Sequence, residues 1–125
     1  MKIAVIIVRL LVGLMFLFAS VVVLFKLMPQ PEATGNAKVF MDGMAATGYL
    51  MTLVKVTELM CAIAFISGFF VPLATVIIFP VTLNILMFHL FMAPEGLPVA
   101  IMLMIGNLFL AYYYRERYMP MLKPK

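Results

Sequence analysis

Long apolar runs fill most of the chain, and short polar breaks separate them. Four runs, at about residues 3–25, 49–70, 73–92 and 98–114, are long enough to cross a bilayer as α-helices. A less apolar segment at about residues 36–47 is too short to span, but it can place its apolar residues on one helical face. The pattern predicts an all-α integral membrane protein. We expect a four-helix transmembrane bundle with a short interfacial or half-buried helix after the first span.

Prolines and a glycine mark the breaks between these elements. Pro29 follows the first run and cannot continue a helix, because proline lacks the amide proton and fixes φ. Gly48 ends the short segment, and Pro72 and Pro98 suit the first turns of the third and fourth spans. The spans and their short connections account for nearly all of the 125 residues, so we expect one transmembrane domain over residues 1–125.

Composition agrees with a membrane location. Hydrophobic residues make up 66% of the chain and charged residues 11%, whereas soluble domains are roughly half apolar and a quarter charged. The net charge of +4 gathers near the two ends, which indicates orientation in a membrane and not a nucleic-acid surface. We expect both termini in the cytoplasm, because the basic residues on their side outnumber Lys26 and Lys38 on the other; they are Lys2, Arg115, Arg117, Lys123 and Lys125.

Polar side chains recur at similar depths in three of the four spans. With a rise of about 1.5 Å per residue, Glu58, Asn84 and Asn107 fall near the middle of their spans. Lys55 lies about one turn outward from Glu58, and His89 lies outward from Asn84. Lys55 and Glu58 are three residues apart, so they share a helix face and can pair. Charges at this depth must face the bundle interior or a water-filled cavity.

Two interpretations of this polar level stay open. In the first, the polar residues form a structural knot that joins the helices through hydrogen bonds. In the second, they line a ligand-binding pocket that opens to the outer leaflet, with the candidate residues Glu58, His89, Lys55, Asn84, Arg9 and Asn107. Glu58 is the leading candidate, because its carboxyl group could carry protons or hydrogen-bond a ligand carbonyl. Arg9 either reaches the lipid headgroups or pairs with Glu58.

Metal and cofactor motifs are missing from the sequence. With one histidine, His89, and one cysteine, Cys61, the chain has no zinc constellation and no bis-histidine haem site of its own. Cys61 lies in an apolar run and is expected to pack as a small hydrophobe. The sequence has no dinucleotide-binding fingerprint. We expect no metal site, and these residues leave the identity of any cofactor open.

Together these features resemble the DoxX-like family of small bacterial four-helix membrane proteins. The matching positions run over most of the chain: residues 9–16 (RLLVGLMF), Lys26, Gly48, Lys55, Glu58-Leu59, Gly68 and residues 72–74 (PLA). The family often has a glycine pair after the glutamate, where this chain has Cys61-Ala62. It often has a glycine before the lysine that ends the first span, where this chain has Ser20 among larger residues.

The resemblance implies a redox-associated protein, because some members are linked to thiosulfate–quinone oxidoreduction and to oxidative-stress complexes. We expect a small multi-pass protein of the bacterial inner membrane that is a quinone- or lipid-binding accessory subunit beside a redox partner protein. One alternative is a small proton-coupled transporter, which with four spans would need to form a homodimer. Another is a non-catalytic membrane assembly or scaffold protein. Whether the chain is an enzyme stays open.

Overall fold

The computed structural model describes residues 2–27, 34–122 and 124. The expected break at Pro29 and the basic residues Lys123 and Lys125 lie outside the described residues. The elements in chain order are α1 (Lys2–Leu24), α2 (Gly35–Ala46), α3 (Leu50–Ser67), α4 (Val71–Phe91), η1 (Pro94–Gly96), α5 (Leu97–Tyr113), α6 (Arg115–Tyr118) and η2 (Met119–Leu122). The described part of the chain contains no strand, so the all-α prediction is confirmed.

Four segments are long and apolar enough to cross a membrane. They are α1, α3, α4 and the continuous stretch Pro94–Tyr113 formed by η1 and α5. The predicted multi-pass arrangement is therefore confirmed. The short helix expected after the first span is α2, and an ion pair forms on its surface between Lys38 Nζ and Asp42 Oδ2 at 3.0 Å.

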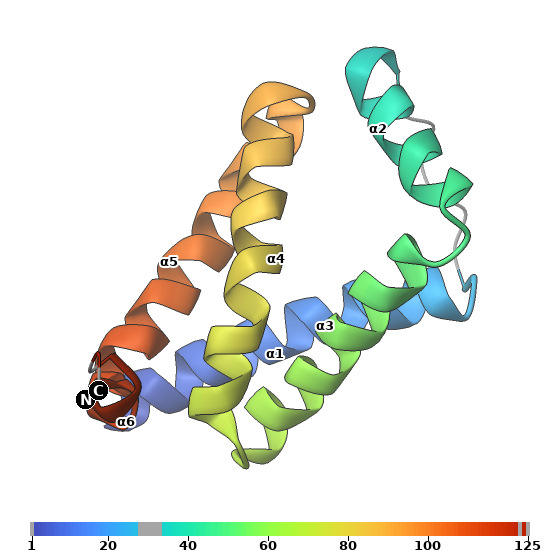
Figure 1. Ribbon diagram of the computed structural model, residues 1–125. Helices are drawn as coiled ribbons and strands as arrows, with labels where there is room; N and C mark the ends of the chain where they lie inside the picture. Colours follow the sequence, from blue (N-terminus) through green and yellow to red (C-terminus); the bar gives the residue numbers. More distant parts are fainter. Residues whose placement is uncertain (1, 28–33, 123, 125) are drawn as a thin grey trace.

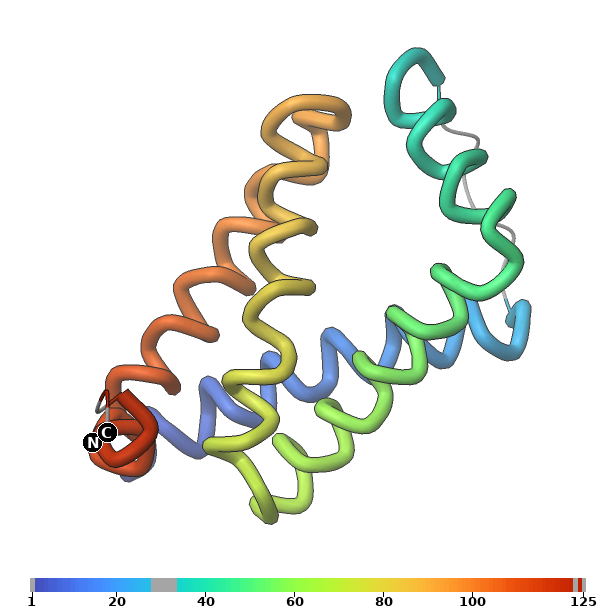
Figure 2. Tube along the Cα trace, viewed as in Figure 1, coloured from blue at the N-terminus to red at the C-terminus, as the bar shows by residue number. Residues whose placement is uncertain are grey.

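The spans are arranged as two helix pairs. Figure 1 shows α1 beside α3 and α4 beside α5. The pairs meet at the end that holds the start of α1, the α3–α4 turn and the end of α5, which we call the terminal end. They diverge toward the opposite end, which we call the far end, where α2 and η1 lie (Figure 2).

The α3–α4 turn is tightly made. Gly68 caps α3 with a left-handed backbone (φ 84°), and its amide donates to the Ala64 carbonyl at 2.9 Å. Pro72 stands in the first turn of α4, as expected from the sequence. Tyr118 of α6 donates from its hydroxyl to the Pro72 carbonyl at 3.0 Å. Partial burial raises the pKa of the Tyr118 phenol, which keeps it protonated as a donor. The hydrogen bond fixes α6 against the turn.

Small residues let α1 approach α3 closely. A Cβ atom at Gly13 would lie 2.9 Å from Ile66 Cγ1 and 3.3 Å from the Ala62 carbonyl oxygen. Ala62 itself is fully buried in this contact. Small residues on both helices permit this close packing, as in other membrane helix pairs.

Replacing Gly13 with valine should therefore destabilise the fold. We expect the free energy of unfolding to fall by about 1–3 kcal/mol, because extra methyl groups in a filled contact force the helices apart. Reversible unfolding in detergent, followed by circular dichroism, measures the loss. Gly43→Val is the matched control, because a Cβ atom at Gly43 on α2 meets nothing within 4 Å. Equal stability of the two variants would contradict the close α1–α3 contact.

Candidate functional site

The structure brings four of the six candidate residues together in the far half of the molecule. Lys55 and Glu58 of α3 and Asn84 and His89 of α4 line one cavity of about 160 Å³. Its remaining wall includes three side chains of α2, namely Phe40, Met41 and Met44. We call this space the α2-side cavity. The Phe40 and Phe88 ring centroids lie 5.3 Å apart, so α2 contacts α4 across the gap seen between their ribbons.

A second cavity of about 370 Å³ is lined by three of these polar residues, Lys55, Glu58 and His89, but not by Asn84. It is bounded by α1 and α5 in addition to α3 and α4, and we call it the α5-side cavity. Lys55, Glu58, Ile85 and His89 line both cavities. Apart from the polar residues shared with the α2-side cavity, its walls are apolar, formed by Met15, Phe16, Phe18, Ala19, Ile85, Val99, Ala100 and Leu103. A polar wall therefore faces a larger apolar space.

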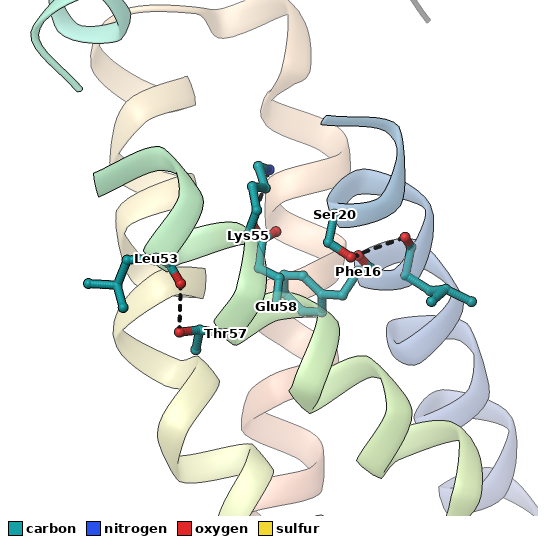
Figure 3. A network of polar contacts seen from close by, with 7 residues as sticks. Phe16, Ser20, Leu53, Lys55, Thr57 and Glu58 are labelled. Carbon is teal, nitrogen blue, oxygen red and sulfur yellow. Dashed lines mark hydrogen bonds and ion pairs between the residues drawn. The ribbon is translucent and has the colours of Figure 1, made fainter. Parts of the chain in front are cut away.

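Lys55 and Glu58 form an ion pair within the shared wall. Lys55 Nζ lies 3.0 Å from Glu58 Oε2, and both side chains project from α3 (Figure 3). The Glu58 side chain is 2% exposed and the Lys55 side chain 17%. Glu58 Oε2 accepts no hydrogen bond of good geometry from the described residues, despite the short distance to the ammonium group. The carboxylate is thus held by charge and keeps capacity to accept a further donor.

His89 is held in place by the turn that follows α4. Its Nδ1 lies 3.0 Å from the Ala93 carbonyl oxygen. Because a carbonyl only accepts, Nδ1 must carry the proton, and in a neutral ring Nε2 is then left as an acceptor. The ring packs against Gly96, where a Cβ atom would clash with it. The η1 turn therefore fixes both the position and the tautomer of His89.

The other two candidates lie toward the terminal end. Arg9 Nη1 comes within 3.1 Å of the position that a Cβ atom at Gly68 would take. Gly68 lies about 15 Å beyond Glu58 along the α3 axis, so the Arg9–Glu58 pair considered from the sequence does not form. Asn107 Nδ2 of α5 donates to the Thr75 carbonyl of α4 at 3.3 Å, which joins the two helices away from the cavities.

The hydroxyl groups of the spans satisfy themselves within their own helices. Ser20 donates to the Phe16 carbonyl at 2.7 Å and Thr57 to the Leu53 carbonyl at 2.9 Å, each four residues earlier (Figure 3). Thr75 and Thr82 of α4 do the same. Such bonds satisfy polar groups where no water is available. The polar groups left with capacity for a ligand at the cavities are those of Lys55, Glu58, Asn84 and His89.

Comparison with protein families decides the relationship of the chain. The DoxX family model matches residues 4–91, which is more than two-thirds of the sequence. The protein belongs to the DoxX family. The match includes Lys55, Glu58, Asn84 and His89. Comparison with curated proteins and with solved structures gave no match.

In this DoxX protein, α5 lies beyond the matched residues and yet completes the α5-side cavity. Sequence reasoning missed the walls that α1 and α5 supply, because the hydrophobicity of a span does not show which of its residues face a cavity. The small side chains of Ala19 and Ala100 were the available signal, since they leave space beside the larger residues around them. Within the described residues, no group of three or more His, Cys, Asp or Glu side chains is placed to hold a metal ion. Cys61 is buried as a free thiol.

Proposed function

We propose that this DoxX protein is a quinone- or lipid-binding accessory subunit of a redox system in the bacterial inner membrane, with both termini in the cytoplasm. The observation that carries the proposal is the buried Lys55–Glu58 pair in the wall shared by two cavities. Membrane proteins place charges at this depth at a cost, and such charges commonly mark ligand or proton pathways.

The ligand in this proposal has a polar head and an apolar tail. The ammonium group of Lys55 donates to a head-group oxygen, and Nε2 of His89 accepts from a head-group hydroxyl. The tail lies along Met15, Phe16 and Leu103 in the α5-side cavity, whose volume of about 370 Å³ falls within the range of small-molecule sites. Asn84 offers a further hydrogen bond from the α2-side cavity.

The chain's own contribution would be to position the head group and to supply protons. Reduction of a quinone to a quinol takes up two electrons and two protons. The electrons come from a redox partner protein in this proposal, and Glu58 and His89 pass the protons. The apolar walls keep bulk water from the head group.

Extraction of the purified protein tests the proposal. The protein is purified in mild detergent and extracted with organic solvent, and the extract is analysed by ultraviolet spectroscopy and mass spectrometry. We expect a stoichiometric quinone or lipid from the native protein and its loss from Glu58→Gln, whose circular dichroism shows it to be folded. Glu95→Gln is the matched control, because Glu95 is exposed in η1 and lines neither cavity.

Other outcomes would replace the proposal. A native protein that carries no apolar molecule, together with a sharply destabilised Glu58→Gln variant, would make the ion pair structural and favour an assembly or scaffold protein. Proton-coupled uptake by proteoliposomes that is lost in Glu58→Gln would favour a transporter. Protease access to the basic tail in inverted but not in right-side-out vesicles checks the orientation.

A further inference from the structure

A second candidate site lies at the terminal end, remote from both cavities described above. The α3–α4 turn, residues 68–73, and the α5–α6 junction line an open cavity of about 530 Å³. Its other lining residues are Tyr114 and Arg117. We call it the turn cavity. None of its residues lines the α2-side or the α5-side cavity.

Two arginines from opposite ends of the chain reach the surroundings of Gly68. Arg9 of α1 packs its guanidinium group against Gly68, and Arg117 of α6 lines the turn cavity with Gly68. Neither arginine lies within 4.0 Å of a carboxylate among the residues that the structure describes. Arg9 Nε is buried and has no hydrogen-bond partner there. Two arginines in the surroundings of one glycine, one of them with an unsatisfied buried donor, favour the binding of an anion there.

An apolar groove continues from the turn cavity along the bundle. The groove has a volume of about 350 Å³ and runs between α3 and α4, with Met60, Cys61, Ala64 and Ile77 among its lining residues. Phe70 and Leu73 line both the groove and the turn cavity, so the two spaces adjoin. We call it the α3–α4 groove. A space with a charged lining residue therefore adjoins an apolar groove between two spans.

We propose that the turn cavity and the α3–α4 groove together bind one anionic phospholipid. Arg9 and Arg117 hold its phosphate, because the planar guanidinium group matches the oxygens of a phosphate in pairs. One acyl chain lies in the groove. Phe69 and Phe70 are 71% and 75% exposed at this turn, so their rings are free to contact the lipid beside its phosphate. A soluble phosphate ester would fill the charged part and leave the groove empty.

Native mass spectrometry in detergent tests this site with lipids of matched acyl chains. We expect the protein to retain one phosphatidylglycerol and to lose phosphatidylcholine at a lower collision energy. Arg117→Gln should weaken phosphatidylglycerol binding about tenfold, since each lost charge-assisted hydrogen bond costs at least that factor. Arg115→Gln is the matched control, because the Arg115 guanidinium stacks 4.3 Å from the Tyr112 ring and donates to the Tyr112 carbonyl.

Further variants test the turn cavity and the α3–α4 groove separately. Arg9→Gln should weaken phosphatidylglycerol binding as much as Arg117→Gln does. If Arg9→Gln does not fold, Arg117→Gln still decides the question, because Arg117 is exposed on a surface helix and its replacement should leave the fold intact. Ala64→Phe should block the groove and weaken binding with both charges in place. Four results would each overturn the proposal. Two concern the variants: equal effects of Arg115→Gln and Arg117→Gln, or unchanged binding in Ala64→Phe. The other two concern the ligand: no preference for phosphatidylglycerol, or displacement of the lipid by soluble glycerol phosphate.

Discussion

Replacing Lys55 with methionine is expected to lower the free energy of unfolding by about 3–5 kcal/mol, because Glu58 would stay behind as a buried charge without a partner. The Glu58 side chain is only 2% exposed, so little water contacts it to replace the lost ammonium group. Methionine matches the length of the lysine stem and adds no polar group. Reversible unfolding in mixed detergent micelles, followed by circular dichroism, gives the change.

A double-mutant cycle separates the ion pair from its surroundings. Adding Glu58→Met to Lys55→Met should recover most of the lost stability, since both charges are then gone. Lys38→Met is the control: Lys38 pairs with Asp42 at the same 3.0 Å, but both side chains are more than 60% exposed. Its expected cost is about 0–1 kcal/mol. If Lys55→Met lowers the free energy of unfolding no more than Lys38→Met does, the Lys55–Glu58 pair is hydrated. It is then neither a structural hydrogen-bonded cluster nor part of a pocket that excludes water.

Replacing Ala19 with phenylalanine is expected to weaken binding of a quinone about a hundredfold, which corresponds to about 2.7 kcal/mol. Ala19 stands in the wall of the α5-side cavity, so the added ring would occupy the space proposed for the tail. The Lys55–Glu58 pair on α3 stays intact, and stability should change little because the ring fills an existing void. Titration of the detergent-solubilised protein with a short-chain quinone measures the affinity.

The matched control for this substitution is Ala45→Phe. Ala45 is exposed on α2 and lines neither cavity. Unchanged affinity in Ala45→Phe shows that added bulk alone has no effect. If Ala19→Phe retains the quinone while Glu58→Gln loses it, the ligand lies in the α2-side cavity, and the assignment of the tail to the α5-side cavity is wrong.

The spans and the Lys55–Glu58 pair were predictable because both depend on local rules. A span is recognised from about twenty apolar residues, and residues three apart on a helix always share a face. The positions of Asn84 and His89 near this pair followed from depth alone, because residues at the same depth in adjacent antiparallel spans lie close together.

Predictions made from the depth of a residue along its span were wrong where neighbouring helices are offset, or where a long side chain extends along the helix axis. Asn107 lies near the middle of its span, yet it bonds to Thr75, only one turn from the start of α4. The Arg9 side chain turns toward Gly68 at the terminal end and away from Glu58. Which face each helix turns inward depends on packing such as the Gly13–Ala62 contact, and an apolar span gives no periodic signal for it.

The four spans differ in length, and the bilayer must respond to that difference. At about 1.5 Å per residue, α1 with 23 residues is about 34 Å long and α3 with 18 residues about 27 Å. The hydrocarbon core is about 30 Å thick, so α1 has to tilt, and lipids beside α3 have to shorten to cover it. The membrane is then thinnest next to the helix that carries Lys55 and Glu58. Lipid chain length therefore sets how far the buried charges lie from water, even when no ligand is bound.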